Sequence, residues 1–103
     1  MKKVIVQFTF PDLSTNTFDK SWEEIRKLGH SNPKGLLHHV AGVQGNNLIV
    51  CDVWESIEAF NKFGEILMPV LNKVGFPNIK PIITPVHYEY NGLSVGIAHG
   101  KAA

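Results

Sequence analysis

The stretch LIVCDVWESIEAFNKFGEILMPVLNKVGF, residues 48–76, decides the fold. It begins with a mostly apolar run that continues through Trp54, which is typical of a buried strand. Ser56 is a suitable helix N-cap, and apolar residues then recur at helical spacing as far as Val74. Gly75 is a typical helix stop. The stretch therefore predicts a strand followed directly by a helix with one buried face.

Upstream of this unit, the sequence predicts a strand and a helix. Residues 3–10 are rich in β-branched and aromatic side chains, a composition that favours a strand. Residues 17–28 carry apolar side chains at helical spacing, and either Ser14 or Thr15 can cap the start of that helix. Gly29 ends the helix, and a loop containing a proline follows.

Two further strands complete the predicted domain. Residues 35–44 pair with the strand before Trp54 as a hairpin, with the turn inside residues 45–47. Residues 80–90 predict a last strand, and its two prolines place it at a sheet edge. The order βαββαβ predicts an α+β, ferredoxin-like fold with a four-stranded antiparallel sheet and two helices on one face. We expect the first and third strands at the centre.

Length and composition describe one domain. The 103 residues leave room for a single core, which we expect within residues 1–92, with residues 93–103 as a C-terminal tail. Ten basic and nine acidic side chains give a net charge of +1 without a basic stripe, which disfavours nucleic acid as a partner. No apolar run is long enough to span a membrane, so no membrane partner is expected. A lone cysteine, Cys51, favours a cytoplasmic location without disulfides.

The predicted strands carry more apolar side chains than two helices can cover. Apolar residues are consecutive, and so fall on both faces, from Val4 to Val6 and from Leu48 to Cys51. The helices cover one face only, and the other would exceed the apolar patch that a soluble monomer normally exposes. Two such faces packed about a two-fold axis remove the patch, so we expect a homodimer.

Four segments resemble a known superfamily. They are GLLHHVAG at 35–42, DVWESIEAF at 52–60, LMPVL at 67–71 and PVHYEY at 85–90. They are similar to the dimeric α+β barrel superfamily, and to uncharacterised members of its antibiotic-biosynthesis monooxygenase-like branch. The resemblance spans most of residues 4–90 and is first a signature of fold, because the superfamily also contains haem enzymes, isomerases and members without known activity. It implies a dimeric α+β barrel and, for function, cofactor-independent oxygenation of a small molecule.

Side chains on the predicted strands and first helix are the candidates for a binding site. We expect a mostly apolar pocket between sheet and helices, lined by Trp22, His38, Asp52, Trp54 and phenylalanines. The candidate catalytic bases are His39 and His87, either of which could ionise a phenol or hydroquinone whose anion reacts with oxygen directly. The alternative reading for each histidine is a hydrogen-bonded structural role in its strand.

Adjacent strand residues point to opposite faces, so His38 and His39 cannot both face one pocket. The hairpin loop decides which of them joins Asp52 and Trp54. A two-residue turn at 46–47 places His39 opposite Trp54, whereas a three-residue loop at 45–47 places His38 there. We favour His39.

No metal or cofactor is predicted. The sequence has no HxH, HxxxH or CxxC pattern, and residues 57–75 lack the helix histidine of related haem-degrading enzymes. We therefore expect a small homodimer that binds a hydrophobic, aromatic small molecule and acts as a cofactor-independent monooxygenase. The alternative, from another class, is a non-catalytic ligand-binding or assembly module.

Overall fold

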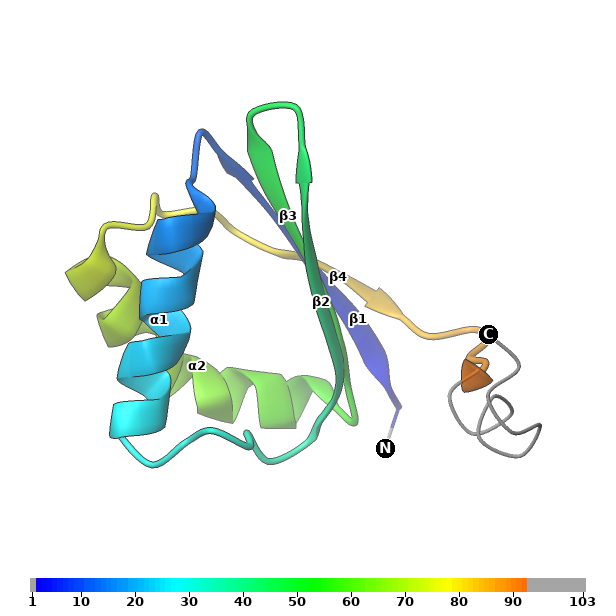
Figure 1. Ribbon diagram of the computed structural model, residues 1–103. Coiled ribbons are helices and arrows are strands. Elements are labelled where there is room, and N and C mark those ends of the chain that lie inside the picture. Colours follow the sequence, from blue (N-terminus) through cyan, green and yellow to red (C-terminus); the bar gives the residue numbers. More distant parts are fainter. Residues whose placement is uncertain (1, 93–103) are drawn as a thin grey trace, which may run out of the picture.

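The computed structural model describes residues 2–92, which form one four-stranded sheet and two helices. The strands are β1 (Val4–Pro11), β2 (Leu36–Gln44), β3 (Asn47–Trp54) and β4 (Ile82–Pro85), and the helices are α1 (Thr15–Lys27) and α2 (Ile57–Val74). All strand pairs are antiparallel, in the order β2-β3-β1-β4. Both helices lie on the same face of the sheet (Figure 1). The ferredoxin-like α+β prediction is thereby confirmed, with β1 and β3 at the centre.

The structure leaves the predicted C-terminal tail undescribed. The expected tail, residues 93–103, lies outside the described residues. Within residues 2–92, neither helix is both long enough and apolar enough to cross a membrane.

Side-chain and backbone caps set the helix ends. The hydroxyl of Ser14 accepts a hydrogen bond from the backbone N–H of Thr17 at 3.1 Å, so Ser14 is the N-cap of α1. The hydroxyl of Ser56 does the same for α2, accepting from the N–H of Ala59 at 3.1 Å. Gly75 ends α2 in the left-handed conformation, with a φ of 95°. These caps are local, which is why the sequence predicts them well.

The last strand is shorter than predicted. Only Ile82–Pro85 pairs with β1 as a strand; Pro81 stands just before it and Pro85 is its last residue. Beyond β4, the N–H of Val86 donates to the carbonyl of Lys3 at 3.0 Å, so the chain still follows β1 for one more residue. The strand is at the sheet edge, as the prolines indicated.

The core lies between the sheet and the helices. In β1 and β3, buried side chains alternate strictly with more exposed ones. The buried side chains of the two strands are Val4, Val6, Phe8, Phe10, Leu48, Val50, Asp52 and Trp54. They meet Ile25 from α1 and Phe60 and Phe63 from α2. The inner face of the sheet is thus almost wholly apolar, with Asp52 as a buried charge.

The outer face of the sheet is less uniformly apolar than predicted. The outward side chains of β3 include Ile49, Cys51 and Val53, which are half-buried. In β1, however, Gln7 and Thr9 point outward and are exposed. The expectation of apolar residues on both faces therefore holds for β3 and fails for the second half of β1.

An ion cluster joins the two helices at the surface. Lys73 on α2 donates a hydrogen bond to Glu24 on α1 at 2.7 Å, and Lys27 donates to the same carboxylate at 3.3 Å. These bonds, first that from Lys73 and then that from Lys27, lower the pKa of Glu24 below its ordinary value. The cluster therefore stays ionised under mildly acidic conditions.

Gly35, just before β2, touches the first turn of α2. Its φ is +89°, and a Cβ there would lie 2.6 Å from the Cβ of Ala59, which is fixed to the helix backbone. We expect Gly35→Ala to lower the free energy of unfolding by about 2–4 kcal/mol, from left-handed strain and overpacking together. Urea denaturation measures the loss.

Gly29 provides the control for that substitution. Its φ is +85°, but no atom lies within 4 Å of a Cβ built there. Gly29→Ala is therefore expected to cost only the strain, about 1–2 kcal/mol. Equal losses for the two variants would show that the contact with α2 is unimportant.

Candidate ligand-binding site

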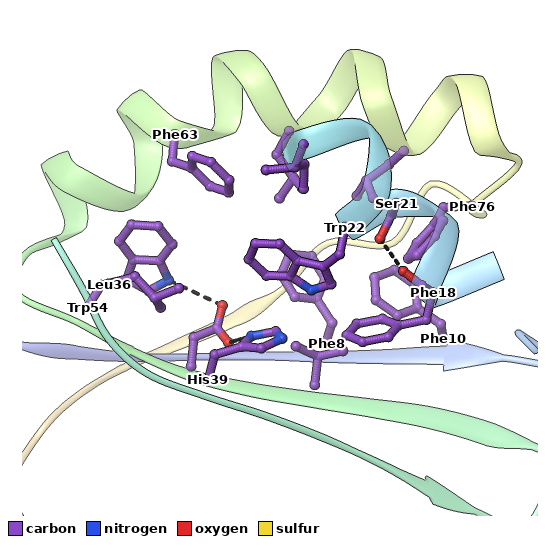
Figure 2. A pocket seen from close by; sticks show the side chains of 15 residues that line it. Phe8, Phe10, Phe18, Ser21, Trp22, Leu36, His39, Trp54, Phe63 and Phe76 are labelled. Carbon is purple, nitrogen blue, oxygen red and sulfur yellow. Dashed lines mark hydrogen bonds and ion pairs between the residues drawn. The ribbon is translucent and has the colours of Figure 1, made fainter. Parts of the chain in front are cut away.

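An apolar cavity lies between the inner face of the sheet and the two helices (Figure 2). Its volume is about 50 Å³, which is room for a few water molecules. The residues that line it are Phe8, Phe10, Phe18, Ser21, Trp22, Ile25, Leu36, His39, Val50, Asp52, Trp54, Phe63, Leu67, Leu71 and Phe76. Most of the lining is aromatic or aliphatic, with His39 and Asp52 as its titratable members.

His39 and Asp52 form the polar centre of this cavity. They are cross-strand partners on β2 and β3, and Nδ1 of His39 lies 2.5 Å from Oδ1 of Asp52. Nε1 of Trp54 donates to the other carboxylate oxygen, Oδ2, at 3.3 Å. The side chain of Asp52 is 10% exposed and that of His39 is 25% exposed. The buried carboxylate of Asp52 therefore has two hydrogen-bond partners, and one of them, the His39 ring, lies at the edge of the cavity.

Two aromatic side chains of α1 flank the imidazole of His39. Phe18 stacks against it with ring centres 5.9 Å apart and an interplanar angle of 6°. Trp22, one helical turn further along α1, meets it edge-on at 5.1 Å. Figure 2 shows both rings over His39, on the side from which α1 packs. The two rings cover part of the imidazole, whose side chain stays 25% exposed.

Trp54 forms the opposite wall of the cavity. It is 1% exposed and packs against Phe60 and Phe63 of α2, with ring centres 5.7 and 5.5 Å away. Its indole ring is therefore fixed by the core, and so is the N–H that it gives to Asp52.

The hairpin register explains why His39 faces the cavity. Gln44 pairs with Asn47, so the turn contains only Gly45 and Asn46, and Gly45 has a φ of 62°. This turn lies one residue before the predicted two-residue turn, and His39 opposes Asp52 instead of Trp54. A register shift of two residues preserves the face. The preference for His39 over His38 agrees with the structure, although the predicted register does not.

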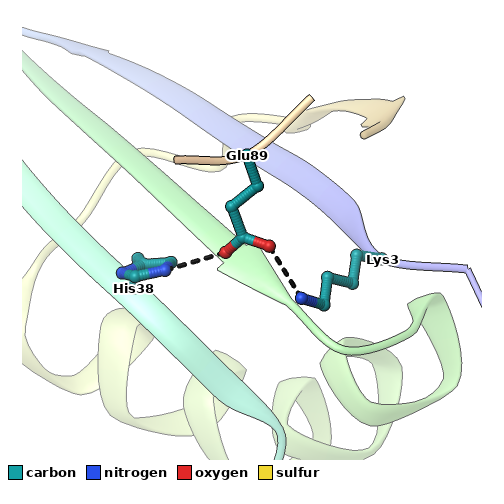
Figure 3. Close-up of polar contacts among 3 residues, drawn as sticks. All are labelled: Lys3, His38 and Glu89. Atoms are coloured by element: carbon teal, nitrogen blue, oxygen red, sulfur yellow. Dashed lines mark hydrogen bonds and ion pairs between the residues drawn. The ribbon is translucent and has the colours of Figure 1, made fainter. Parts of the chain in front are cut away.

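The structure does not place His38 in the cavity, in contrast to our expectation. His38 pairs with Val53 and points to the outer face, where its Nε2 lies 2.9 Å from Oε2 of Glu89. Lys3 donates to the other oxygen of Glu89 at 2.7 Å (Figure 3). Because β3 lies between β1 and β2, Glu89 bridges two strands that are not neighbours.

The contacts of Glu89 change its ionisation. The hydrogen bond from Lys3, and after it that from His38, lowers the pKa of Glu89 below its ordinary value. The residue is therefore an anion over a wider range of acidic pH than a free glutamate, and it keeps the segment after β4 close to the outer face.

His87, the other candidate base, is exposed and does not line the cavity. Trp22, Asp52 and Trp54 do line it, together with His39, so these four predicted residues come together. Phenylalanines were expected in the lining without positions, and Phe18 is one of those that the structure places there. Its position four residues before Trp22 in a helix, which puts both on one face, is the signal that could have found it. Among residues 2–92, no group of three histidine, cysteine or carboxylate side chains could hold a metal ion.

The fold and the site define a small α+β protein of ferredoxin-like topology, with an aromatic chamber between its sheet and its helices. The sequence matches no protein-family model and no curated protein.

Several solved structures share this fold. One is SnoaB, a cofactor-independent oxygenase from Streptomyces nogalater, with a TM-score of 0.62 and 12% identity over 86% of this chain and 97% of that one. Another is the monooxygenase from the gene ActVA-Orf6 of Streptomyces coelicolor, in complex with Nanaomycin D; its TM-score is 0.57, with 16% identity over 87% and 91% of the two chains. MupZ from Pseudomonas fluorescens gives a TM-score of 0.61 and 12% identity over 98% and 82%.

These similarities confirm the predicted resemblance at the level of fold. The chain has the architecture of the antibiotic-biosynthesis monooxygenase-like α+β proteins. Because the identities are 16% or lower in these structures, the likeness assigns no activity to this chain.

Proposed function

We propose that the cavity binds a flat, hydrophobic phenol and that His39 removes its hydroxyl proton. The observation that carries this proposal is the place of the imidazole: His39 contacts Asp52 through one nitrogen and lies beside two aromatic rings at a cavity with an apolar lining. An apolar site with few convergent polar groups is typical of small-molecule binding. A histidine in such a site is a suitable general base near neutral pH.

We propose further that the bound phenolate reacts directly with molecular oxygen, as in a cofactor-independent monooxygenase. One oxygen atom enters the ring carbon that lies para to the hydroxyl, and the other leaves as water. The phenol loses that ring hydrogen and its hydroxyl hydrogen to the water and becomes a quinone, so the substrate supplies the electrons. The shared fold with SnoaB, itself described as a cofactor-independent oxygenase, supports this chemistry.

The size of the cavity sets a condition on this function. About 50 Å³ is too little for an aromatic ring, so a ligand must displace part of the wall. Phe18 and Trp22 are the candidates, because both are only half-buried and both come from α1. The small volume also favours the second candidate function, a non-catalytic assembly module in which these aromatic side chains simply fill the core.

We also propose that the chain forms a homodimer through the outer face of its sheet, and that it acts in the cytoplasm. Register aligns Val40, Cys51, Gln7 and Ile82 in one row across all four strands on that face. Val40 and Ile82 are 63% and 67% exposed, which is unusual for large apolar side chains on the face of a sheet. A second copy of the same row covers them in a symmetric pair.

A chromogenic phenol tests the role of His39. When 4-nitrophenol binds at a pH at which the free probe is mostly protonated, we expect the phenolate absorption to appear. A hydrogen bond to a charged group contributes about 1.5–3 kcal/mol, so His39→Gln should reduce the ionised fraction of bound probe about tenfold or more. His38→Gln, which changes the neighbouring residue on the opposite face, is the matched control and should retain the absorption.

Two outcomes would contradict the proposal. If both variants ionise the probe like the natural protein, His39 is not the base. If the natural protein and both variants bind neither 4-nitrophenol nor a larger phenol such as 1-naphthol, the assembly module is the better description.

A further inference from the structure

We infer that Asp52 and Trp54 are positioning residues that decide which nitrogen of His39 faces the cavity as a hydrogen-bond acceptor. The inference deepens the proposed function, because it rests on His39 acting as the base there.

The hydrogen bonds of Asp52 determine the tautomer of His39. A carboxylate has only acceptors, so the 2.5 Å contact with Oδ1 requires Nδ1 of His39 to carry the proton and donate it. In the neutral imidazole, Nε2 then has no proton and is free to accept one. The side chain of Asp52 is only 10% exposed, which leaves little competition from water for this bond.

Trp54 in turn holds the carboxylate in place. Its Nε1–H donates to Oδ2 at 3.3 Å, while the indole ring is enclosed by Phe60 and Phe63. A buried indole N–H needs an acceptor, and Asp52 supplies it. The two oxygens of Asp52 therefore have separate donors, and the carboxylate cannot rotate without losing one of them.

His38, the neighbouring histidine, shows how a histidine–carboxylate pair differs when it is more exposed. His38 also contacts a carboxylate, that of Glu89, at 2.9 Å. The side chain of His38 is 48% exposed, however. The second donor to its carboxylate partner is the flexible side chain of Lys3, whereas the second donor to Asp52 is the buried indole of Trp54. The two histidines are adjacent on β2 but face opposite sides of the sheet, so His38 is an internal control for His39.

Asparagine at position 52 separates positioning from simple packing. Its side chain has one acceptor oxygen, for which the Trp54 N–H and the His39 Nδ1–H compete. If His39 takes the oxygen, the buried Trp54 N–H is left without an acceptor, which is costly. If Trp54 takes it, the amide NH₂ donates to Nδ1 and the proton of His39 moves to Nε2, at the cavity. We therefore expect Asp52→Asn to reverse the tautomer of His39.

Trp54→Phe removes the competing donor. In the double variant Asp52→Asn with Trp54→Phe, the amide oxygen is free to accept from Nδ1–H again. The tautomer of His39 should then return towards that of the natural protein. A role of Asp52 in packing alone predicts no such return, because the second substitution removes a further buried group.

The test is ¹⁵N NMR of the full-length, uniformly labelled chain without ligand, at alkaline pH where imidazoles are neutral. His39→Gln and His38→Gln assign the signals. We expect the Nδ1–H form for His39 in the natural protein, its loss in Asp52→Asn and its return in the double variant. His38 should keep one tautomer pattern in all three proteins.

A His39 that carries its proton on Nε2 in the natural protein would overturn the inference, and this result does not depend on the folding of any variant at Asp52 or Trp54. Retention of the Nδ1–H form in Asp52→Asn would also overturn it. The 4-nitrophenol measurement separates this failure from that of the proposed function. Reversal of the tautomer without ionisation of the probe by the natural protein would support the positioning role and contradict the role of His39 as base.

Discussion

We expect Val40→Lys to convert the proposed homodimer into a monomer. Val40 is 63% exposed on the outer face of β2, where it pairs with Cys51 and begins the row of residues that the proposed dimer covers. In an isolated chain this substitution should change the stability by no more than about 0.5 kcal/mol, because the side chain already meets water. In a dimer it buries an ammonium group without a partner, which costs several kcal/mol by estimates for buried ions. Light scattering after size-exclusion chromatography gives the mass.

Asn61→Lys provides the matched control for charge. Asn61 is exposed on α2, in the helical layer away from the outer face, and the substitution adds the same positive charge. We expect this variant to keep the mass of two chains. A single-chain mass for the natural protein at working concentration would refute the dimer outright.

Alanine in place of Trp54 is expected to lower the free energy of unfolding by about 3–5 kcal/mol. The indole is 1% exposed and packs on Phe60 and Phe63, so its removal leaves a void that the surrounding core cannot easily fill. The substitution also removes a donor from the buried Asp52. Urea denaturation at one fixed protein concentration measures the loss, since the stability of a dimer depends on concentration.

Trp22→Ala tests whether this loss comes from burial. Both tryptophans line the same cavity, but Trp22 is only half-buried and lies on α1 at its edge. We expect a loss about half as large, in proportion to the smaller apolar area removed. A loss for Trp54→Ala that does not exceed that for Trp22→Ala would contradict the assignment of Trp54 to the centre of the core.

Part of the candidate site could be predicted from the sequence. Asp52 and Trp54 are two residues apart on a strand, so they must share a face, and the apolar pattern of the following helix indicates the face towards the core. Which histidine joins them depends on the position of the turn. The actual two-residue turn at Gly45 and Asn46 is one residue earlier than the predicted one, yet it places His39 on the same face. The histidine that faces the cavity was therefore predicted through an incorrect register.

The sequence by itself determined the elements of this protein and their order. Ser14, Ser56 and Gly75 end or begin helices through hydrogen bonds and backbone angles that span only a few residues. Pro81, just before β4, and Pro85, at its end, likewise favour a sheet edge, because each lacks a backbone donor. Such effects depend on neighbouring residues, and they can be read from the sequence alone.

Only the tertiary structure decided which distant side chains meet. The partners of His39 come from α1 and β3, and the partner of His38, Glu89, is 51 positions away in the sequence. A small aromatic cavity lies on the inner face of the sheet because Phe18 and Trp22 of α1 point towards that face. These contacts follow from strand register and helix packing, which are set by the sum of many weak interactions across the whole domain.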